Sequence, residues 1–215
     1  MNRSFLTNLF SLLFLLLIVP ATSSVKATDK IPVTTSSAEA KEEFFKGRDL
    51  FDKLRAQNSL QYFDKAIEMD KDFALAYYYN ALASPTPKRF FTNIDNAIAH
   101  SDKVSDGEKL VILAAQAGAY GNPVKQKEYL TKLVELYPKD ERAHTLLGTF
   151  FFGQQQYNNA VMQLKKANEV APDYSAPYNM LGYSLKNIGK YDEAEKAFKK
   201  YTHLIPEELP FHKQS

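Results

Sequence analysis

Apolar residues recur every three or four positions along most of the chain after about residue 40. Leu130, Leu133, Val134 and Tyr137 are one example, with charged and polar residues between them. This spacing places the apolar side chains on one face of an α-helix. The region is rich in Ala, Leu, Lys, Glu and Tyr, which suits helices better than sheets. The pattern therefore predicts an all-α protein built from amphipathic helices.

The helical pattern repeats along the chain with the same register in each unit. The repetition predicts five helix–turn–helix units, at about 40–73, 74–106, 107–140, 141–174 and 175–208. Because one hairpin cannot bury its own apolar face, the units are expected to stack into a solenoid. Positions that recur from unit to unit are Leu113/Leu147/Leu181, Pro138/Pro172/Pro206, Gly148/Gly182, Tyr157/Tyr191 and Ala160/Ala194.

A small residue occupies the same position in the first helix of every unit. We expect the two helices of each hairpin to come closest there, because a larger side chain would force their axes apart. The five residues are Gly47, Ala81, Ala114, Gly148 and Gly182.

The last full unit resembles the tetratricopeptide repeat, a helix–turn–helix unit of about 34 residues. The resemblance implies a right-handed α-solenoid in which the first helix of each hairpin lines a concave groove, where ligands, usually peptides, lie. The residues that carry the resemblance are Tyr178, Leu181-Gly182, Tyr191, Ala194, Phe198 and Pro206, and the unit before it matches with Leu147-Gly148, Tyr157, Ala160 and Pro172.

The family's groove positions, carried onto this sequence, identify nine candidate binding residues. Members that grip a peptide's terminal carboxylate use Lys and Asn in the groove. Thr145 and Thr149 stand at two such positions here, so we expect that clamp to be absent. The alternative for each candidate is ordinary exposed helix surface. The candidates are aromatic or uncharged apart from one arginine: Arg48, Phe51, Tyr78, Val111, Thr145, Thr149, Phe152, Asn179 and Tyr183.

Local sequence signals mark several helix ends. Ser105 with Glu108 predicts a capping box. Asn122 followed by Pro123 predicts an N-cap and a first helical residue. Glycines that lie in or beside the turns within hairpins suit a positive φ; they are Gly121, Gly153 and Gly189.

The N-terminus has the pattern of an export signal. Arg3 precedes an apolar run over residues 9–19, and small residues follow Pro20. That run is shorter than the roughly 20 residues of a spanning helix, so we interpret residues 1–27 as a signal peptide. The alternative is an uncleaved anchor. Residues 28–39 are polar and aperiodic, and we expect a flexible linker with a capping box of Ser36 and Glu39. The protein is then periplasmic or secreted, with no membrane span after cleavage.

Charge and composition exclude several kinds of function. Without residues 1–27, which carry Arg3 and Lys26, the chain has 25 basic and 25 acidic residues. This balance gives no electrostatic basis for binding nucleic acid. The absence of cysteine removes thiol catalysis, disulfides and thiolate metal sites. The four histidines lie in different units, and no phosphate loop or nucleophile motif is present. We expect a protein that is not an enzyme and holds no cofactor or metal.

The sequence thus predicts a scaffold that binds a protein or peptide in its groove. An alternative is an accessory or assembly subunit of a bacterial envelope complex, docking through the C-terminal end. Residues 209–215 form a short tail after the last unit, too short for a capping helix. The outward face of the last helix, including Tyr201 and Leu204, is therefore expected to be partly bare and open to self-association.

Overall fold

A computed structural model describes residues 29–205 of the chain, and these contain α-helices, one short 3₁₀ helix and no strand. The segment interpreted as a signal peptide, Pro206 and the predicted C-terminal tail lie outside the described residues. The helices are α1 (Ala38–Asp52), α2 (Ala56–Met69), α3 (Ala74–Ala83), α4 (Pro87–Ala99), α5 (Asp106–Ala119), α6 (Pro123–Leu136), α7 (Glu141–Gly153), α8 (Tyr157–Val170), α9 (Ala176–Asn187) and α10 (Tyr191–Leu204), with η1 (Ser101–Lys103) between α4 and α5.

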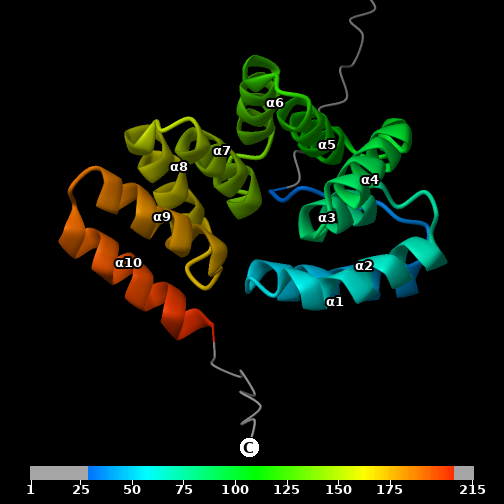
Figure 1. Ribbon diagram of the computed structural model, residues 1–215, viewed down its shortest axis with the longest axis horizontal. Coiled ribbons are helices and arrows are strands. Elements are labelled where there is room, and N and C mark those ends of the chain that lie inside the picture. Colours follow the sequence, from blue (N-terminus) through cyan, green and yellow to red (C-terminus); the bar gives the residue numbers. More distant parts are fainter. Residues whose placement is uncertain (1–28, 206–215) are drawn as a thin grey trace, which may run out of the picture.

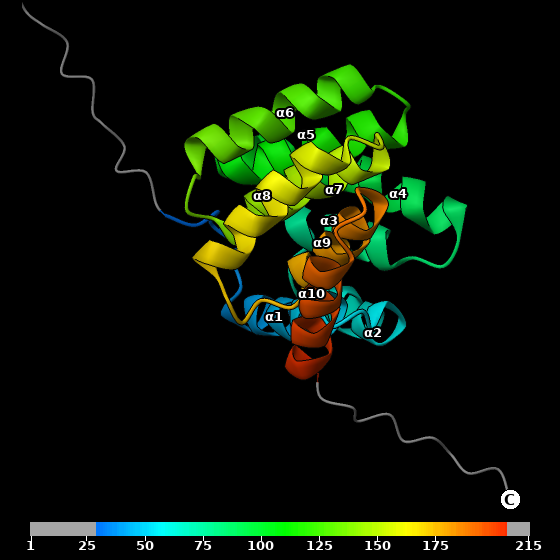
Figure 2. The same ribbon diagram turned by 90° about the vertical axis from the view of Figure 1, so that its left-hand side faces the viewer.

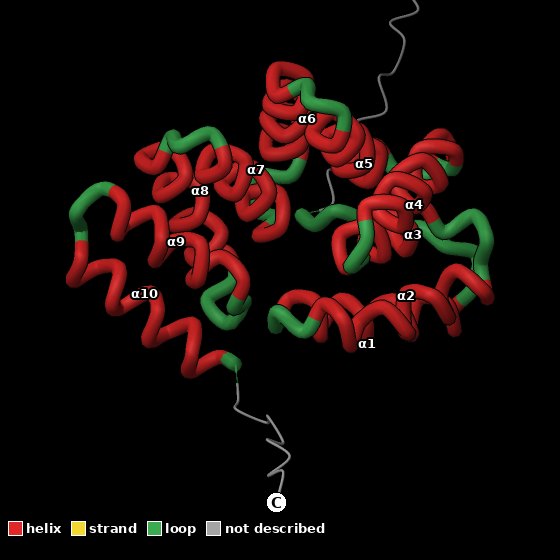
Figure 3. The backbone as a smooth tube through the Cα atoms, viewed as in Figure 1, coloured by secondary structure: helices red, strands yellow, loops and turns green. Residues whose placement is uncertain are grey.

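Successive helices pair into five hairpins within the described part, and the hairpins stack side by side in chain order (Figure 1). The stack curves, so that the α9–α10 hairpin returns towards the α1–α2 hairpin, as the tube in Figure 3 also shows. The view in Figure 2 looks along this arc from the side of α10. The predicted all-α solenoid of helix–turn–helix units is therefore confirmed.

Close packing within each hairpin depends on the predicted small residues. A Cβ added to Gly148 would lie 2.7 Å from Leu164 Cγ, and one added to Gly182 would lie 2.5 Å from a Phe198 ring carbon. A Cβ added to Gly47 would lie 2.8 Å from a carbon of the Phe63 ring. Each partner lies on the second helix of the same hairpin. The other small repeat positions are buried as well: Ala81, Ala114, Ala160 and Ala194.

Helix caps agree with several of the local signals. Ser105 and Glu108 form the capping box at the start of α5, and Asn122 caps α6 with Pro123 as its first residue. Pro138 and Pro172 are exposed in the loops after α6 and α8. Their carbonyl groups bond side chains of the next helix, since Pro138 O lies 2.9 Å from His144 Nε2 and Pro172 O accepts from the Tyr178 hydroxyl.

One residue in the hairpin turn has a positive φ in four of the five hairpins. Gly121 and Gly189 take φ values of 72° and 77° there, as expected. Gly153 does not, because the residue that makes this turn is Gln155, with φ 58°. Leu54 has φ 59° at the corresponding turn of the first hairpin. Gln155 stands one repeat after Gly121 and one repeat before Gly189. The position within the repeat therefore predicts the turn residue better than the presence of a nearby glycine does.

The segment that we expected to be a flexible linker is ordered. Residues 29–37, the N-terminal strap, run across the loops that join successive hairpins (blue in Figure 1). Buried carboxylates of Asp70, Glu108 and Asp140 receive its backbone N–H groups. Polar, aperiodic composition suggested disorder, but the bonds that order the strap come from residues 34 to 109 positions further along the chain.

The strap also corrects the predicted start of the first helix. Ser37, and not Ser36, is the N-cap of α1, accepting a hydrogen bond from Ala40 N. The amide and hydroxyl of Ser36 donate instead to Asp70 Oδ2. The long-range carboxylate therefore outcompetes the local capping box at Ser36.

Candidate interaction surface

The inner side of the arc contains two neighbouring cavities, of about 300 and 440 Å³. The smaller lies between the first two hairpins and the last two, and the larger lies between the second, third and fourth hairpins. First helices of the hairpins supply most of the lining. Four residues line both cavities: Tyr78, Leu82, Leu146 and Thr149. The two cavities therefore form one continuous groove, which we call the inner groove.

Six of the nine candidate residues line the inner groove, although they come from five different hairpins. Tyr78 and Thr149 border both cavities. The other four are Phe51, Val111, Thr145 and Asn179. The register of the repeat thus brings these positions together on one surface.

The remaining three candidates lie elsewhere. The Phe152 ring packs edge-on against Tyr157 of its own hairpin, at a centroid distance of 5.6 Å. Tyr183 is half exposed and packs in the same way on Phe198. Neither ring lines the inner groove, because each is held by the second helix of its hairpin.

Arg48 lies beside the groove and does not line it. Its guanidinium carbon lies 4.6 Å from the Phe45 ring centroid and 5.5 Å from that of Phe44. Burial lowers the pKa of Arg48, and the nearby Arg142 charge adds to the effect. Stacking on aromatic faces holds this arginine in place.

Four of the lining residues missed by the sequence reasoning occupy two repeat positions. Leu82 stands one residue after the small residue Ala81, as Thr149 stands after Gly148, so the register could have identified it. The second position lies two residues before the small residue, and the family groove pattern skips it. Its members in the groove are Tyr79, Leu146 and Met180.

A buried ion pair closes the arc at the edge of the groove. Arg142 of α7 bonds Asp52 of α1 through both guanidinium nitrogens, at 3.0 and 2.6 Å. The Arg142 guanidinium also stacks on the Tyr174 ring at 4.8 Å, and the Ser175 hydroxyl donates to the Asp52 carbonyl. Burial opposes the charge on Arg142, but Tyr79, Tyr174 and Asp52 together hold its pKa well above the ordinary value. We call the Asp52–Arg142 pair the latch.

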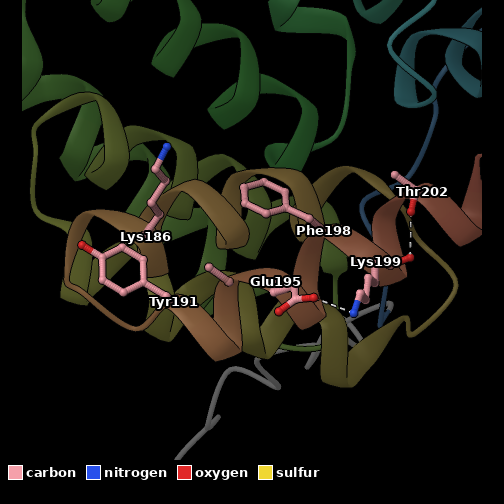
Figure 4. Close-up of a pocket in the computed structure, with 7 residues that line it drawn as sticks. Lys186, Tyr191, Glu195, Phe198, Lys199 and Thr202 are labelled. Atoms are coloured by element: carbon pink, nitrogen blue, oxygen red, sulfur yellow. Dashed lines mark hydrogen bonds and ion pairs between the residues drawn. The ribbon is translucent and has the colours of Figure 1, made fainter.

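The outer face of the last hairpin carries a separate cavity of about 360 Å³ (Figure 4). Phe198 forms its apolar floor, and Lys186, Glu195 and Lys199 surround it, with Lys199 paired to Glu195 at 2.6 Å. Thr202 lies at one end, as Figure 4 shows. Tyr201 and Leu204, expected on the bare face, are half-buried.

Two further features concern the described residues only. No cluster of three or more His, Asp or Glu side chains there has a geometry that could hold a metal ion. None of the helices between residues 29 and 205 is long and apolar enough to cross a membrane.

Comparison with known proteins agrees with this architecture. The tetratricopeptide-repeat family model matches residues 141–174, and a second model of the same repeat matches residues 164–196. The chain is a tetratricopeptide-repeat protein. The matched residues are the two hairpins in which the repeat pattern is strongest. The earlier hairpins of this tetratricopeptide-repeat protein have the same helical layout with a weaker sequence pattern.

Relatives of this tetratricopeptide-repeat protein share only part of its sequence. It is 34% identical over 67 residues to anaphase-promoting complex subunit 3 of Dictyostelium discoideum, a stretch that covers 31% of this chain and 7% of that subunit. Among solved structures, a thermophilic tetratricopeptide-repeat protein of Thermus thermophilus is similar with a TM-score of 0.53 and 18% identity, covering 79% of this chain and 93% of that one. PilW, a type IV pilus biogenesis factor, has a TM-score of 0.51 at 16% identity and covers 79% of each chain. These likenesses show the fold.

Proposed function

We propose that this tetratricopeptide-repeat protein is a non-enzymatic interaction scaffold that holds a peptide or protein segment in its inner groove. The observation that carries the proposal is the meeting of six candidate residues, from five hairpins, around one groove. Concave, largely apolar surfaces with a few polar groups are typical binding sites. The likeness of one stretch to a subunit of a multiprotein complex also supports an interaction role.

A pair of matched substitutions tests the groove. Thr149→Trp places a large ring in the groove at an exposed position that lines both cavities. Thr202→Trp places the same ring in the cavity on the last hairpin. We expect Thr149→Trp to abolish capture of the partner that the wild-type protein retains, while Thr202→Trp leaves it unchanged. Retention of the partner by Thr149→Trp at full affinity would contradict the proposal.

A second candidate function uses the last hairpin. An accessory or assembly subunit of an envelope complex would dock through the outer face of α10, and the 360 Å³ cavity with its Phe198 floor favours this surface. The same two variants separate the candidates, because this function predicts the opposite result. Capture would then be lost with Thr202→Trp and kept with Thr149→Trp. The same face is our candidate for self-association, which concentration-dependent sedimentation of the Thr202→Trp variant would test.

We further propose that the protein works outside the cytoplasm, in the periplasm or after secretion. The basic start, short apolar run and small residues of segment 1–27 support export. Fusion of this segment to a reporter that is active only after export tests the proposal. The reporter is expected to be active with the intact segment and inactive when Leu15→Arg and Leu16→Arg interrupt the apolar run.

A further inference from the structure

The inner groove contains polar side chains that bond no other residue of the described structure, and Tyr78 is the most buried of them. Tyr78 lines both cavities and is only 4% exposed. Its hydroxyl makes no hydrogen bond to any residue between 29 and 205. Among residues 29–205, two side-chain atoms are both fully enclosed and without a hydrogen-bond partner, Glu43 Oε2 and Asn168 Oδ1. The Tyr78 oxygen is not one of them, and because it also has no protein partner it must be accessible from the cavity.

A hydroxyl placed in this way is suited to binding. Because its oxygen is open to the cavity and bonds no residue of the described structure, it can donate a hydrogen bond to an acceptor on a ligand there. Burial raises the pKa of Tyr78, so the hydroxyl stays protonated and remains a donor. Two further polar side chains of the groove, Thr149 and Asn179, also make no side-chain hydrogen bond among the described residues.

The electrostatics of the groove restrict what it accepts. Asp52 and Arg142 are the charged side chains that line the two cavities in the described structure, and they neutralise each other in the latch. The other lining groups are aromatic, aliphatic or neutral polar. A charged side chain or chain terminus entering here would lose its hydration without gaining a counter-charge from the lining residues.

We propose that the inner groove selects an uncharged, apolar peptide segment whose backbone carbonyl accepts a hydrogen bond from the Tyr78 hydroxyl. The proposal rests on the scaffold function given above and identifies the chemistry of its partner. Leu82, Leu146 and Phe150 line the space on either side of Tyr78 and contact the apolar side chains of the segment. Thr149 and Asn179 are placed to bond its other backbone groups.

A titration with two capped peptides tests the charge requirement. The probes are acetyl-Leu-Gly-Leu-amide and acetyl-Asp-Gly-Asp-amide, followed by NMR shifts of the purified protein. We expect the leucine peptide to bind with a Kd at least about tenfold lower than that of the aspartate peptide, because the carboxylates would be desolvated without a partner. Equal affinities, or no binding of the leucine peptide, would overturn the proposal.

Substitution Tyr78→Phe tests the hydrogen bond. It keeps the ring and removes the hydroxyl, so affinity for the leucine peptide is expected to fall about 2- to 10-fold. The free protein should unfold at about the same temperature, because the hydroxyl bonds no residue of the described structure. Tyr183→Phe, outside the groove, is the matched control and should bind as the wild type does.

The outcomes distinguish this inference from the scaffold proposal itself. Loss of partner capture in Thr149→Trp together with unchanged peptide affinity in Tyr78→Phe would overturn the role of Tyr78 and leave the scaffold function standing. Unchanged capture in Thr149→Trp would overturn both.

Discussion

Single residues set the spacing of the helices in this solenoid. Gly148 and Gly182 allow the second helix of each hairpin to approach until its side chain touches the backbone of the first. A side chain at either position meets Leu164 or Phe198, neither of which is the flexible end of a long side chain. The loss of stability on adding a side chain therefore depends on how far the two helices of the hairpin must separate.

The substitution Gly182→Leu is expected to destabilise the protein by about 1–3 kcal/mol or more through overpacking against Phe198. Denaturant unfolding measures the change. Gly153→Ala is the control, because a Cβ there meets nothing within 4 Å and φ is not positive. That variant should be neutral or slightly more stable, since alanine favours the helix. An unchanged midpoint for Gly182→Leu would show that the assigned contact is wrong.

The turn residue Gln155 holds a backbone conformation that glycine adopts more readily. At φ 58° a side chain costs conformational energy, and the equivalent residues of the third and fifth hairpins are glycines. Gln155→Gly is expected to raise the free energy of unfolding by about 0.5–1 kcal/mol. The glycine's greater freedom in the unfolded chain limits the gain. Thermal unfolding measures it, and a lower melting temperature would contradict the expectation.

At the scale of the element, the N-terminal strap joins hairpins that are distant in sequence. It contacts Asp70 at the end of α2, Glu108 in the first turn of α5 and Asp140 at the start of α7, so it spans the second and third hairpins from end to end. Hydrogen bonds from strap amides to carboxylates are charge-assisted and therefore stronger than neutral ones. We infer that the strap stiffens the curve of the array.

Removing one carboxylate tests the seating of the strap. In Asp70→Asn the side chain loses an acceptor oxygen, while Thr35 Oγ1, Ser36 N and Asp72 N all donate to Asp70 in the native protein. We expect a loss of about 1–3 kcal/mol and faster trypsin cleavage after Lys30. Asp72→Asn is the control: its carboxylate pairs with Lys103 and His100 and accepts nothing from the strap. Equal cleavage of both variants would argue against the strap contact.

Acid is expected to release the strap. Burial opposes the charge on Asp70 and Glu141, but the bonds from Thr35 and Ser36 in one case and from Lys30 in the other hold each pKa below its ordinary value. A carboxylate with a lowered folded-state pKa stabilises the fold above its unfolded pKa of about 4, and the effect is lost as pH falls through the folded value. Amide exchange protection at Ser36, whose N–H donates to Asp70, should therefore fall below pH 4. Constant protection from pH 6 to 3 would contradict this.

At the scale of the whole molecule, the latch sets how far the arc closes. Its two partners come from the first and fourth hairpins, 90 residues apart, and their side chains are only 14% and 19% exposed. The contact therefore ties the start of the array to a hairpin near its end, across the mouth of the inner groove. We infer that the width of the groove depends on this contact.

The substitution Asp52→Asn is expected to open the arc and to lower stability by about 3 kcal/mol, because Arg142 would keep a buried charge without a partner. Small-angle scattering should show a larger radius of gyration. Lys165→Met is the matched control, since it removes a pair to Glu193 whose side chains are 46% and 40% exposed. That change should cost less than about 1 kcal/mol and leave the radius unchanged. An unchanged radius in Asp52→Asn would show that the latch does not hold the curve.

The sequence by itself determined the helices, their pairing and the residues that allow close packing. These follow from interactions within a single repeat: apolar spacing, caps such as Ser105 with Glu108, and the small residue of each first helix. The register of the repeat also predicted groove residues correctly, for example Tyr78 and Thr149.

The tertiary structure alone decided the strap, the latch and the hydroxyl at the centre of the groove. Nothing in the sequence marks Asp70 and Asp140, or Glu108 beyond its capping box, as partners of the strap, and only the stacking of the hairpins aligns them along one extended segment. Asp52 and Arg142 meet only because the curvature accumulated over four hairpins brings them together. Local sequence patterns determine each hairpin. The curvature of the array is the sum of small rotations between successive hairpins, and these rotations cannot be read from the repeat pattern of the sequence.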